Sequence, residues 1–426
     1  MSLSLHAGTW DDLAFRSATS PWDGMVINGG SHDPVTAANA MTARWAANCS
    51  GESVVLAGVG AWILLAYLAS AAEGRGRTEL QEAVGMNAEV ASRGAQDVLT
   101  VLNGSPAINS ALGLWTSRKL PLQPAWTAAL PGGARGELTG NPTEDQLRLD
   151  AWASGQTGGL IPTMPVSLTE ETLLVLAGAL TVRTTWLRPF IDDVELPRTG
   201  PWAGREIHAL RRVTRILDRA TVIDGPSGRL TMLRVMGTGG IDVRLVLGEE
   251  SRKAGEVLRA GIEALSGRHP AVKADALPIG ESAPGMTVRS VRSYDPGDFL
   301  SVTVPRFTVA SSHDLLGLPA VFGLDAVTDR TRGHFPGIST EPLAVSQARQ
   351  DAVATFNASG FEAAAVTAVG AIAAGIAPPP PHRVKNVDVE FSRPFGFLAV
   401  DRRSGLVLTA GWVAEPEDLA YLEDVL

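Results

Sequence analysis

Residues 53–72, between Glu52 and Glu73, form a run without a single charged side chain. The run reads SVVLAGVGAWILLAYLASAA and is apolar on every side of a helix, so that helix has to be buried in lipid or inside a protein. Clusters of basic residues, which commonly flank a membrane span, are missing at both ends. We therefore expect a helix buried inside a large core, with a single membrane span as the alternative.

A second uncharged run covers residues 363–381, AAAVTAVGAIAAGIAPPPP. It contains two glycines and ends in four prolines, which break a helix because proline lacks the N–H and clashes with the preceding turn. Valine, threonine and isoleucine suit a buried strand, although alanine and glycine weaken that preference. Taken alone, the run predicts a loop made of small residues.

Composition and charge exclude several classes of protein. Apolar residues make up 45% of the chain and charged residues 19%, which is enough apolar material for a large core. A net charge of −9 gives no basic surface, so we expect neither a nucleic-acid partner nor binding to a membrane surface. Cys49 is the only cysteine, so no intramolecular disulfide can form, and we expect this residue to be buried. Many alanines and few lysines indicate a GC-rich bacterial genome.

The order of the predicted elements is helices first and mainly strands later, which indicates an α+β fold rather than regular βαβ alternation. Helical patterns cover 34–49, 60–72, 77–84, 87–104, 143–155 and 251–266. Strand-like runs cover 107–116, 172–183, 230–248, 300–310, 345–356 and 387–413. We expect residues 1–32 to be an N-terminal extension and 33–426 a single domain. The first residues do not resemble a signal peptide, and the compartment stays open.

Motifs for catalysis are missing from the sequence. It has no G-x-S-x-G elbow, no H-E-x-x-H pair and no Walker-type glycine loop. Val54–Gly60 runs as an apolar strand into Gly-x-Gly, but Ile63 stands where a dinucleotide fingerprint needs its third glycine. The seven histidines are scattered without metal-ligand spacing. We therefore expect no enzymatic activity, no metal and no cofactor.

Several segments resemble the serpin family and occur in that family's order. They include W-x-x-P-F at 186–190, which closes an apolar strand, and a hinge-like sequence, NASGFEAAA, at 357–365. The segments are 149–162, 173–190, 301–324, 357–365 and 389–411. Together they cover roughly 33–416.

The resemblance implies a fold in which helices surround a large mixed sheet and smaller antiparallel sheets, with an exposed reactive loop at about 358–388. Residues 53–72 become the helix behind the main sheet, and 363–381 fall in the reactive loop. A serpin is cleaved as a suicide substrate by a serine protease. Its loop then inserts into the main sheet as a new strand while it is still esterified to the enzyme. The resemblance thus implies a monomeric protease inhibitor, with a non-inhibitory binding or structural module as the alternative.

The family's register gives the reactive site. Counting fourteen residues from Gly360 places the cleaved bond at Ala374–Gly375. The reactive-site residues are Ile372, Ala373, Ala374, Gly375 and Ile376. Small apolar side chains predict a serine protease with a small apolar specificity pocket, elastase-like or subtilisin-like, and the lack of Lys and Arg disfavours trypsin-like enzymes.

The hinge preceding the reactive site carries small residues that suit insertion into a sheet. The hinge residues are Gly360, Phe361, Glu362, Ala363, Ala364 and Ala365. One face of the inserted strand would present only small or β-branched side chains, at 363, 365, 367, 369 and 371.

Three features depart from the family's pattern. Phe361 stands where inhibitors carry a small or hydroxylated residue, and we expect its ring to enter the core during insertion and slow it. Ala358 replaces a glutamate, so Arg306 is expected to lose its partner. The Ser, Ser, Asn and His that control opening of the sheet are replaced, so their hydrogen bonds should be lost. The sheet-opening region then comprises Ala57, Gly60, Gly178, Trp186, Arg306 and Gln350.

Overall fold

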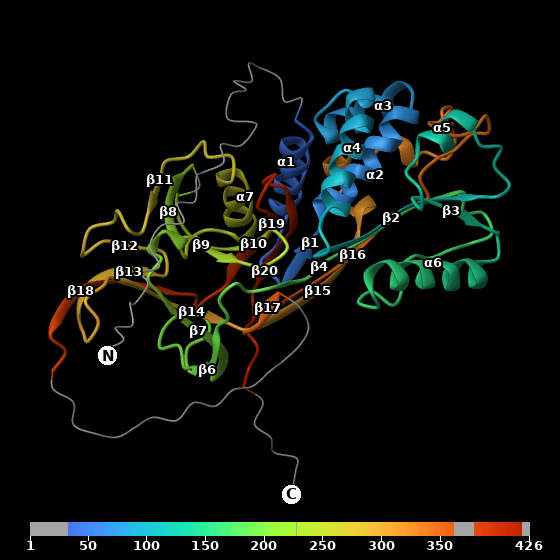
Figure 1. The fold of residues 1–426 in the computed structure, drawn as a ribbon. Coiled ribbons are helices and arrows are strands. Elements are labelled where there is room, and N and C mark those ends of the chain that lie inside the picture. Colours follow the sequence, from blue (N-terminus) through green and yellow to red (C-terminus); the bar gives the residue numbers. More distant parts are fainter. Residues whose placement is uncertain (1–32, 227, 362–378, 420–426) are drawn as a thin grey trace, which may run out of the picture.

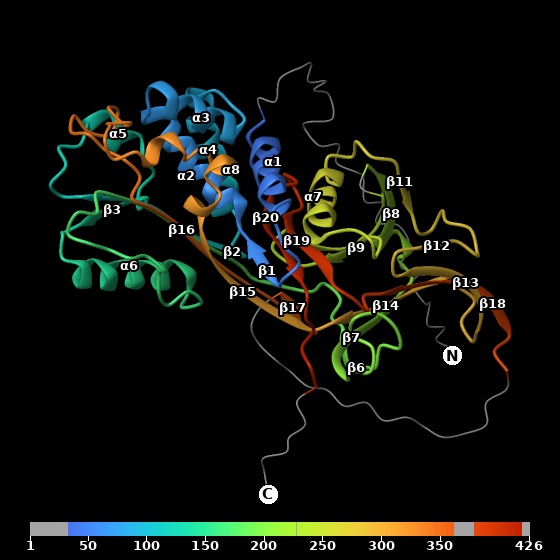
Figure 2. The same cartoon turned by 180° about the vertical axis from the view of Figure 1, so that it is seen from behind.

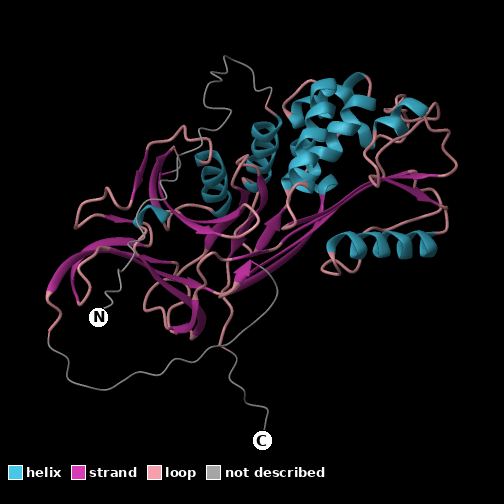
Figure 3. Ribbon diagram, in the orientation of Figure 1, coloured by secondary structure: helices cyan, strands magenta, loops and turns pink. Residues whose placement is uncertain are grey.

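The computed structural model describes residues 33–226, 228–361 and 379–419 (Figures 1 and 3). Its helices are α1 Pro34–Ala46, α2 Gly58–Ala71, α3 Gly74–Val84, α4 Ala88–Asn103, α5 Pro124–Ala129, α6 Pro142–Thr157, α7 Ala254–Ala264 and α8 Pro319–Phe322. Three of the helix boundaries follow from local chemistry. The Asp33 side chain caps α1 by accepting from two backbone N–H groups, and the Asn141 side chain does the same for α6. Gly85, with a φ of 71°, ends α3 in the left-handed conformation.

The central sheet has five strands in the order β15-β16-β4-β2-β3. Their bounds are β2 Ile108–Ser117, β3 Arg135–Leu138, β4 Leu174–Val182, β15 Phe307–Asp314 and β16 Gln347–Phe356. The sheet is mixed, because β16–β4 and β2–β3 are parallel pairs and the other neighbours are antiparallel. Helices α2 and α4 cover one face, and α6 packs on the opposite face against β2 and β4 (Figures 1 and 2).

Besides a two-stranded pair of β5 (Thr184–Thr185) and β17 (Gly360–Phe361), two further sheets complete the described architecture. One has seven strands, all antiparallel to their neighbours, in the order β1-β20-β19-β10-β9-β8-β11. The other has six, in the order β12-β13-β18-β14-β7-β6. The bounds are β1 Val54–Leu56, β6 Ile191–Glu195, β7 Ile207–Thr214, β8 Ala220–Gly225, β9 Gly228–Met236, β10 Ile241–Leu247, β11 Ala271–Lys273, β12 Ser282–Ala283, β13 Met286–Ser293, β14 Phe299–Pro305, β18 His382–Glu390, β19 Phe395–Asp401 and β20 Val407–Val413. The α+β prediction is confirmed, and the sheet with the most strands is the antiparallel one.

The uncharged run at 53–72 divides into β1 and α2. Every residue of α2 is buried except Ser70, because α1, α3 and α4 lie against one side of it and the sheets against the other. The helix is apolar on every side because every side is buried, as expected of a helix inside a protein core. Among the described residues, no helix is both long enough and apolar enough to cross a membrane. Cys49, three residues after the end of α1, is half-buried, and burial raises the pKa of its thiol to about 11.

Candidate functional site

The parallel pair β16–β4 forms a seam in the middle of the central sheet. The ladder runs from Gln347 opposite Val175 to Ala352 opposite Leu180. Beyond the seam, β4 continues into β5 (Thr184–Thr185), and the chain leaving β16 turns into β17 (Gly360–Phe361). These two short strands pair antiparallel, so the chain after β16 already begins a new strand beside the continuation of β4.

The turn between β16 and β17 is held by the segment after β5. The Asn357 side-chain oxygen accepts from the backbone N–H groups of Ser359 and Gly360, both at 2.9 Å. Trp186 donates its indole N–H to the Asn357 carbonyl and its backbone N–H to the Ser359 carbonyl, also at 2.9 Å. Phe190 N–H donates to the Ala358 carbonyl. Because each bond fixes main-chain atoms, the start of the hinge has one defined path.

Gly360 and Phe361 fit this path in different ways. A Cβ at Gly360 would collide with the Thr184 carbonyl oxygen, so only glycine allows the close approach of the two strands. The Phe361 side chain is 1% exposed, and its ring centre lies 6.1 Å from that of Phe397. The expectation that this ring enters the core only during insertion is therefore wrong, because it is buried before any cleavage.

The other predicted loop residues lie outside the described residues. They are Glu362, Ala363, Ala364 and Ala365 of the hinge, and Ile372, Ala373, Ala374, Gly375 and Ile376 of the reactive site. Their roles stay predictions.

Arg306, at the junction of β14 and β15, has a carboxylate partner. Its Nε lies 3.0 Å from Glu417 Oε2, and Thr308 Oγ1 donates to Glu417 Oε1 at 3.0 Å. The prediction that Arg306 loses its partner is wrong, because the segment after β20 brings Glu417 to it in place of a hinge glutamate. Phe307, the next residue, stacks on Phe356 at the end of β16, with ring centres 5.4 Å apart. Arg306 therefore lies near the hinge rather than at the middle of the seam.

Gln350 joins β16 to the junction between β1 and α2. Its side-chain oxygen accepts from Ala57 N–H at 3.1 Å, and its side-chain nitrogen donates to the Ala57 carbonyl at 2.8 Å. The side chain is 2% exposed, so both bonds lie out of contact with water. Gln350 thus bonds the backbone of Ala57 and not a residue on β4, so this contact does not replace a cross-link over the seam.

The small residues around Gln350 provide its space. A Cβ at Gly60 would lie 3.3 Å from the Gln350 side-chain nitrogen and 3.1 Å from a Leu112 methyl. Gly178 is the residue directly opposite Gln350 across the seam. Four of the predicted sheet-opening residues (Ala57, Gly60, Gly178 and Gln350) therefore come together, while Trp186 and Arg306 lie at the hinge.

Two residues of β15 were missed by sequence reasoning. Ser311 Oγ accepts from Val55 N–H at 3.0 Å, and His313 Nε2 donates to the Val55 carbonyl at 2.8 Å. His313 stands opposite Gln350 in the β15–β16 ladder. The two side chains therefore bond the backbone of Val55 and of Ala57, which lie two residues apart in the same segment. Burial lowers the pKa of His313. Ser311 and His313 alternate along β15 with Phe307 and Val309, so all four side chains share one face of the strand, which is the sequence signal that could have identified them. Polar residues on an edge strand normally face solvent, and this pattern therefore does not indicate a buried contact.

Opening the seam would leave these side-chain contacts in place. Ser311, His313 and Gln350 tie β15 and β16 to Val55 and Ala57, on the same side of the seam. Gly178, on the β4 side, has no side chain with which to bridge it. At this level the backbone ladder is what holds β16 to β4.

Comparison with known proteins agrees with this architecture. The family model of the serpins, described as serpin (serine protease inhibitor), matches residues 36–198 and 286–416. A rice (Oryza sativa subsp. japonica) serpin designated Z6A is 29% identical over 386 residues, covering 83% of this chain and 91% of the rice protein. Alpha-1-antitrypsin of the pig (Sus scrofa) is 32% identical over 114 residues, 26% of this chain and 25% of the pig protein.

Solved structures show the same fold. Human thyroxine-binding globulin in complex with thyroxine superposes with a TM-score of 0.66, at 16% identity, over 91% of this chain and 99% of the globulin. A serpin from the trematode Schistosoma haematobium gives a TM-score of 0.65 over 91% of this chain. The order of the segments, the sheets with their buried α2 and the family match lead to one conclusion: the chain belongs to the serpin family, whose members are generally protease inhibitors.

Proposed function

We propose that the protein inhibits a serine protease as a suicide substrate, with its reactive loop cleaved at Ala374–Gly375 and inserted between β4 and β16. The antiparallel pairing of β17 with β5 carries this proposal. An extra antiparallel strand at the end of a parallel seam is the first step of such an insertion, and parallel pairs are slightly less stable per residue than antiparallel ones.

The observed register supports the proposal when it is continued along the chain. Gly360 lies opposite Thr185 and Phe361 opposite Thr184. Two residues further on, position 363 would lie opposite Val182, position 365 opposite Leu180 and position 367 opposite Gly178. Val182 and Leu180 face the main core on the α2 side of the sheet. The side chains that would enter this core are therefore those of Ala363, Ala365 and Thr367, which are all small.

The same register would bring Thr367 to Gln350. The turn hydrogen bond from Asn357 N–H to the Gly360 carbonyl defines a hairpin whose continuation sets Thr367 against Gln350 on β16. Gly178 on β4 has no side chain, which would leave room for Thr367 on the side away from Gln350. An inserted strand would thus fit between β4 and β16 without displacing the Gln350–Ala57 contact.

The energetics favour insertion once the loop is cut. Adding a strand of roughly 14 residues to a ladder is worth on the order of 10–15 kcal/mol, at about 1 kcal/mol net per hydrogen bond. The cost of burying Phe361 does not oppose this gain, because its ring is buried already. At the other end of the loop, β18 is paired on both sides, with β13 and with β14. The two ends created by cleavage can therefore separate while β18 stays in its sheet.

The chemistry of trapping needs one bond change before insertion. The serine Oγ of the protease adds to the Ala374 carbonyl carbon, the Ala374–Gly375 C–N bond breaks, and Gly375 leaves as an amine with the proton. The ester that remains joins the protease to the end of the loop. Insertion has to carry the protease away before water hydrolyses this ester. Small side chains on both sides of the bond favour an elastase-like or subtilisin-like target.

The test is to incubate the protein with elastase and with subtilisin and to follow the mixture by denaturing gel and intact mass spectrometry. We expect a complex that survives denaturant, with the summed mass of both proteins less the C-terminal peptide beginning at Gly375. Clean cleavage with full protease activity would refute the inhibitory mechanism.

A pair of loop variants tests the insertion itself. Ala365→Arg would place a charge opposite Leu180 in the core, so we expect cleavage at an unchanged bond with no stable complex. The matched control, Ala377→Arg, adds the same charge beyond the proposed bond and should still form the complex. Equal complex formation by both variants would contradict insertion between β4 and β16.

A further inference from the structure

A small recess rich in arginine lies between β7, β9 and the segment that follows β5. Its volume is about 100 Å³. Four of the residues that line it are arginines, and none of its described lining residues is an aspartate or glutamate. The arginines are Arg188, Arg212, Arg219 and Arg234. Such a concentration of one charge is notable in a chain whose net charge is −9.

Arg212 is fixed in place, but no acidic side chain among the described residues pairs with its charge. Its guanidinium carbon lies 4.1 Å from the centre of the Phe190 ring, and one terminal nitrogen donates to the Arg188 carbonyl at 2.8 Å. Its Nε is buried and has no hydrogen-bond partner among the described residues. Burial and, to a smaller extent, the neighbouring charges of Arg219 and Arg188 lower the pKa of Arg212 to about 10.

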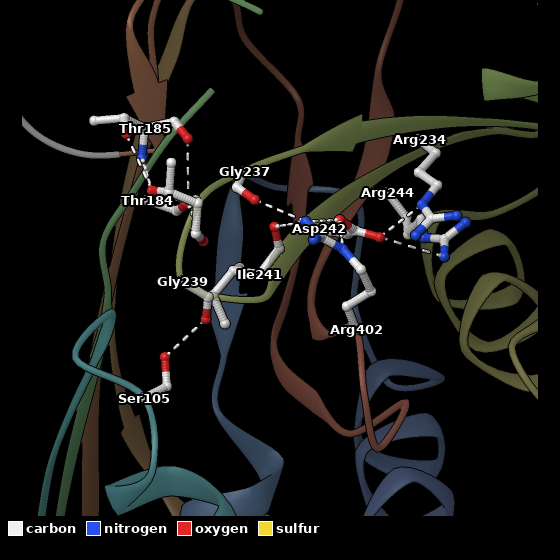
Figure 4. Close-up of polar contacts among 11 residues, drawn as sticks. Ser105, Thr184, Thr185, Arg234, Gly237, Gly239, Ile241, Asp242, Arg244 and Arg402 are labelled. Carbon is white, nitrogen blue, oxygen red and sulfur yellow. Dashed lines mark hydrogen bonds and ion pairs between the residues drawn. The ribbon is translucent and has the colours of Figure 1, made fainter. Parts of the chain in front are cut away.

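The carboxylate that pairs with Arg234 is shared with two other arginines. Asp242 is fully buried on β10 and accepts from Arg234 Nε at 2.6 Å and from Arg402 Nε at 2.8 Å. Arg244 lies 3.8 Å from the same carboxylate. Figure 4 shows these three arginines around the single aspartate. Asp242 is thus shared by three arginines, and neither Arg212 nor Arg219 has an acidic partner among the described residues.

We propose that this recess binds a single phosphate or sulfate group. Guanidinium groups present pairs of N–H donors that match the oxygens of such anions. A water molecule occupies about 30 Å³ in the liquid, so the recess holds roughly three waters, which suits one tetrahedral anion and is too small for a drug-sized molecule. Leu187, on the rim, is 54% exposed and would contact an apolar group attached to the anion. None of the residues that line the recess belongs to the predicted reactive loop.

Calorimetric titration and thermal unfolding test the proposal with sodium phosphate and sodium sulfate, against sodium chloride at constant ionic strength. We expect saturable binding of phosphate and sulfate, a concentration-dependent rise of Tm, and no such response to chloride. Arg212→Gln should weaken binding at least tenfold. If this variant does not fold, Arg219→Gln provides the same test at a half-buried position.

The matched control is Arg93→Gln on α4, which removes one positive charge from an exposed position outside the recess. It should leave the affinity unchanged. The proposal is overturned if neither anion binds saturably, or if Arg93→Gln weakens binding as much as Arg212→Gln. A phosphoserine peptide and a sulfated monosaccharide then separate the two sources, since tighter binding than the inorganic ion identifies the natural carrier.

Discussion

At the scale of single residues, the contact between Gln350 and Ala57 is the one most specific to this chain. Gln350→Leu would leave the Ala57 N–H and carbonyl buried without partners, so we expect a loss of about 2–4 kcal/mol in the free energy of unfolding. Urea denaturation measures it. The matched control is Gln347→Leu on the same strand, whose side chain bonds the backbone of Ser167 in an exposed setting. It should cost under about 1 kcal/mol, and equal losses would show that burial is not the cause.

His313 predicts a pH dependence of stability. Its folded pKa lies below the unfolded value of about 6.5, so the native state favours the neutral ring. The contribution of His313 to the free energy of unfolding is therefore complete above about pH 6.5. It decreases as the pH falls below this value, because the unfolded state then binds more protons than the folded state. The raised pKa of Asp351, caused by burial, acts in the opposite direction at lower pH.

Thermal unfolding between pH 8 and pH 5.5 measures this effect. The Tm of the native chain should fall over this range, and His313→Gln should make the decrease shallower. His382→Gln, at an exposed histidine, should leave the slope unchanged. A slope that is the same in all three proteins would contradict the role of His313.

The residues that form the cluster around Gln350 could be predicted, but their hydrogen-bond and ion-pair partners could not. The family resemblance implied that Gly60, Gly178 and Gln350 lie together, and the structure brings them together. It could not indicate that Gln350 would bond the backbone of Ala57, or that Glu417 would reach Arg306 from a distant segment. Both contacts depend on where the chain returns in space, which no local pattern contains.

At the scale of elements, the crossing of α1 and α2 depends on a glycine. A Cβ at Gly58 would collide with the Thr42 side chain and lie 2.9 Å from its Cα. Gly58→Ala should therefore destabilise the protein by about 1–3 kcal/mol through overpacking, although alanine favours a helix by about 1 kcal/mol. Chemical denaturation measures the change.

The control for this prediction is Gly155→Ala in α6, where nothing lies within 4 Å of the added Cβ. Here the helix propensity acts alone, so the variant should be stabilised by about 0.5–1 kcal/mol. A stabilised Gly58→Ala would show that the two helices are not in close contact at this point.

The central strands could be predicted from their apolar sequence patterns, whereas some edge strands could not. The apolar runs at 107–116 and 172–183 became β2 and β4 because both are buried by helices on either side of the sheet. By contrast, β6 reads IDDVE and β12 has two residues, so neither carries an apolar pattern long enough to predict a strand. Their pairing is set by neighbouring strands rather than by their own residues.

At the scale of the whole molecule, the arrangement of the sheets followed from resemblance to a family rather than from periodicity. Local patterns indicated an α+β fold but could not specify that β16 lies beside β4, more than 160 residues away in the sequence. Nor could they indicate that the hinge begins inside the molecule. The burial of Phe361 and the pairing of β17 with β5 bear most directly on the proposed function, because the proposed insertion would continue from them.

Thermal unfolding of the intact chain and of the chain cut in its loop tests whether cleavage adds a strand to the central sheet. If residues after Phe361 insert between β4 and β16, the cut protein should gain on the order of 10 kcal/mol and melt at least ~10 °C higher. The cut Ala365→Arg variant should show little of this rise. A cut native chain that melts at or below the temperature of the intact one would rule out the insertion of the cleaved loop.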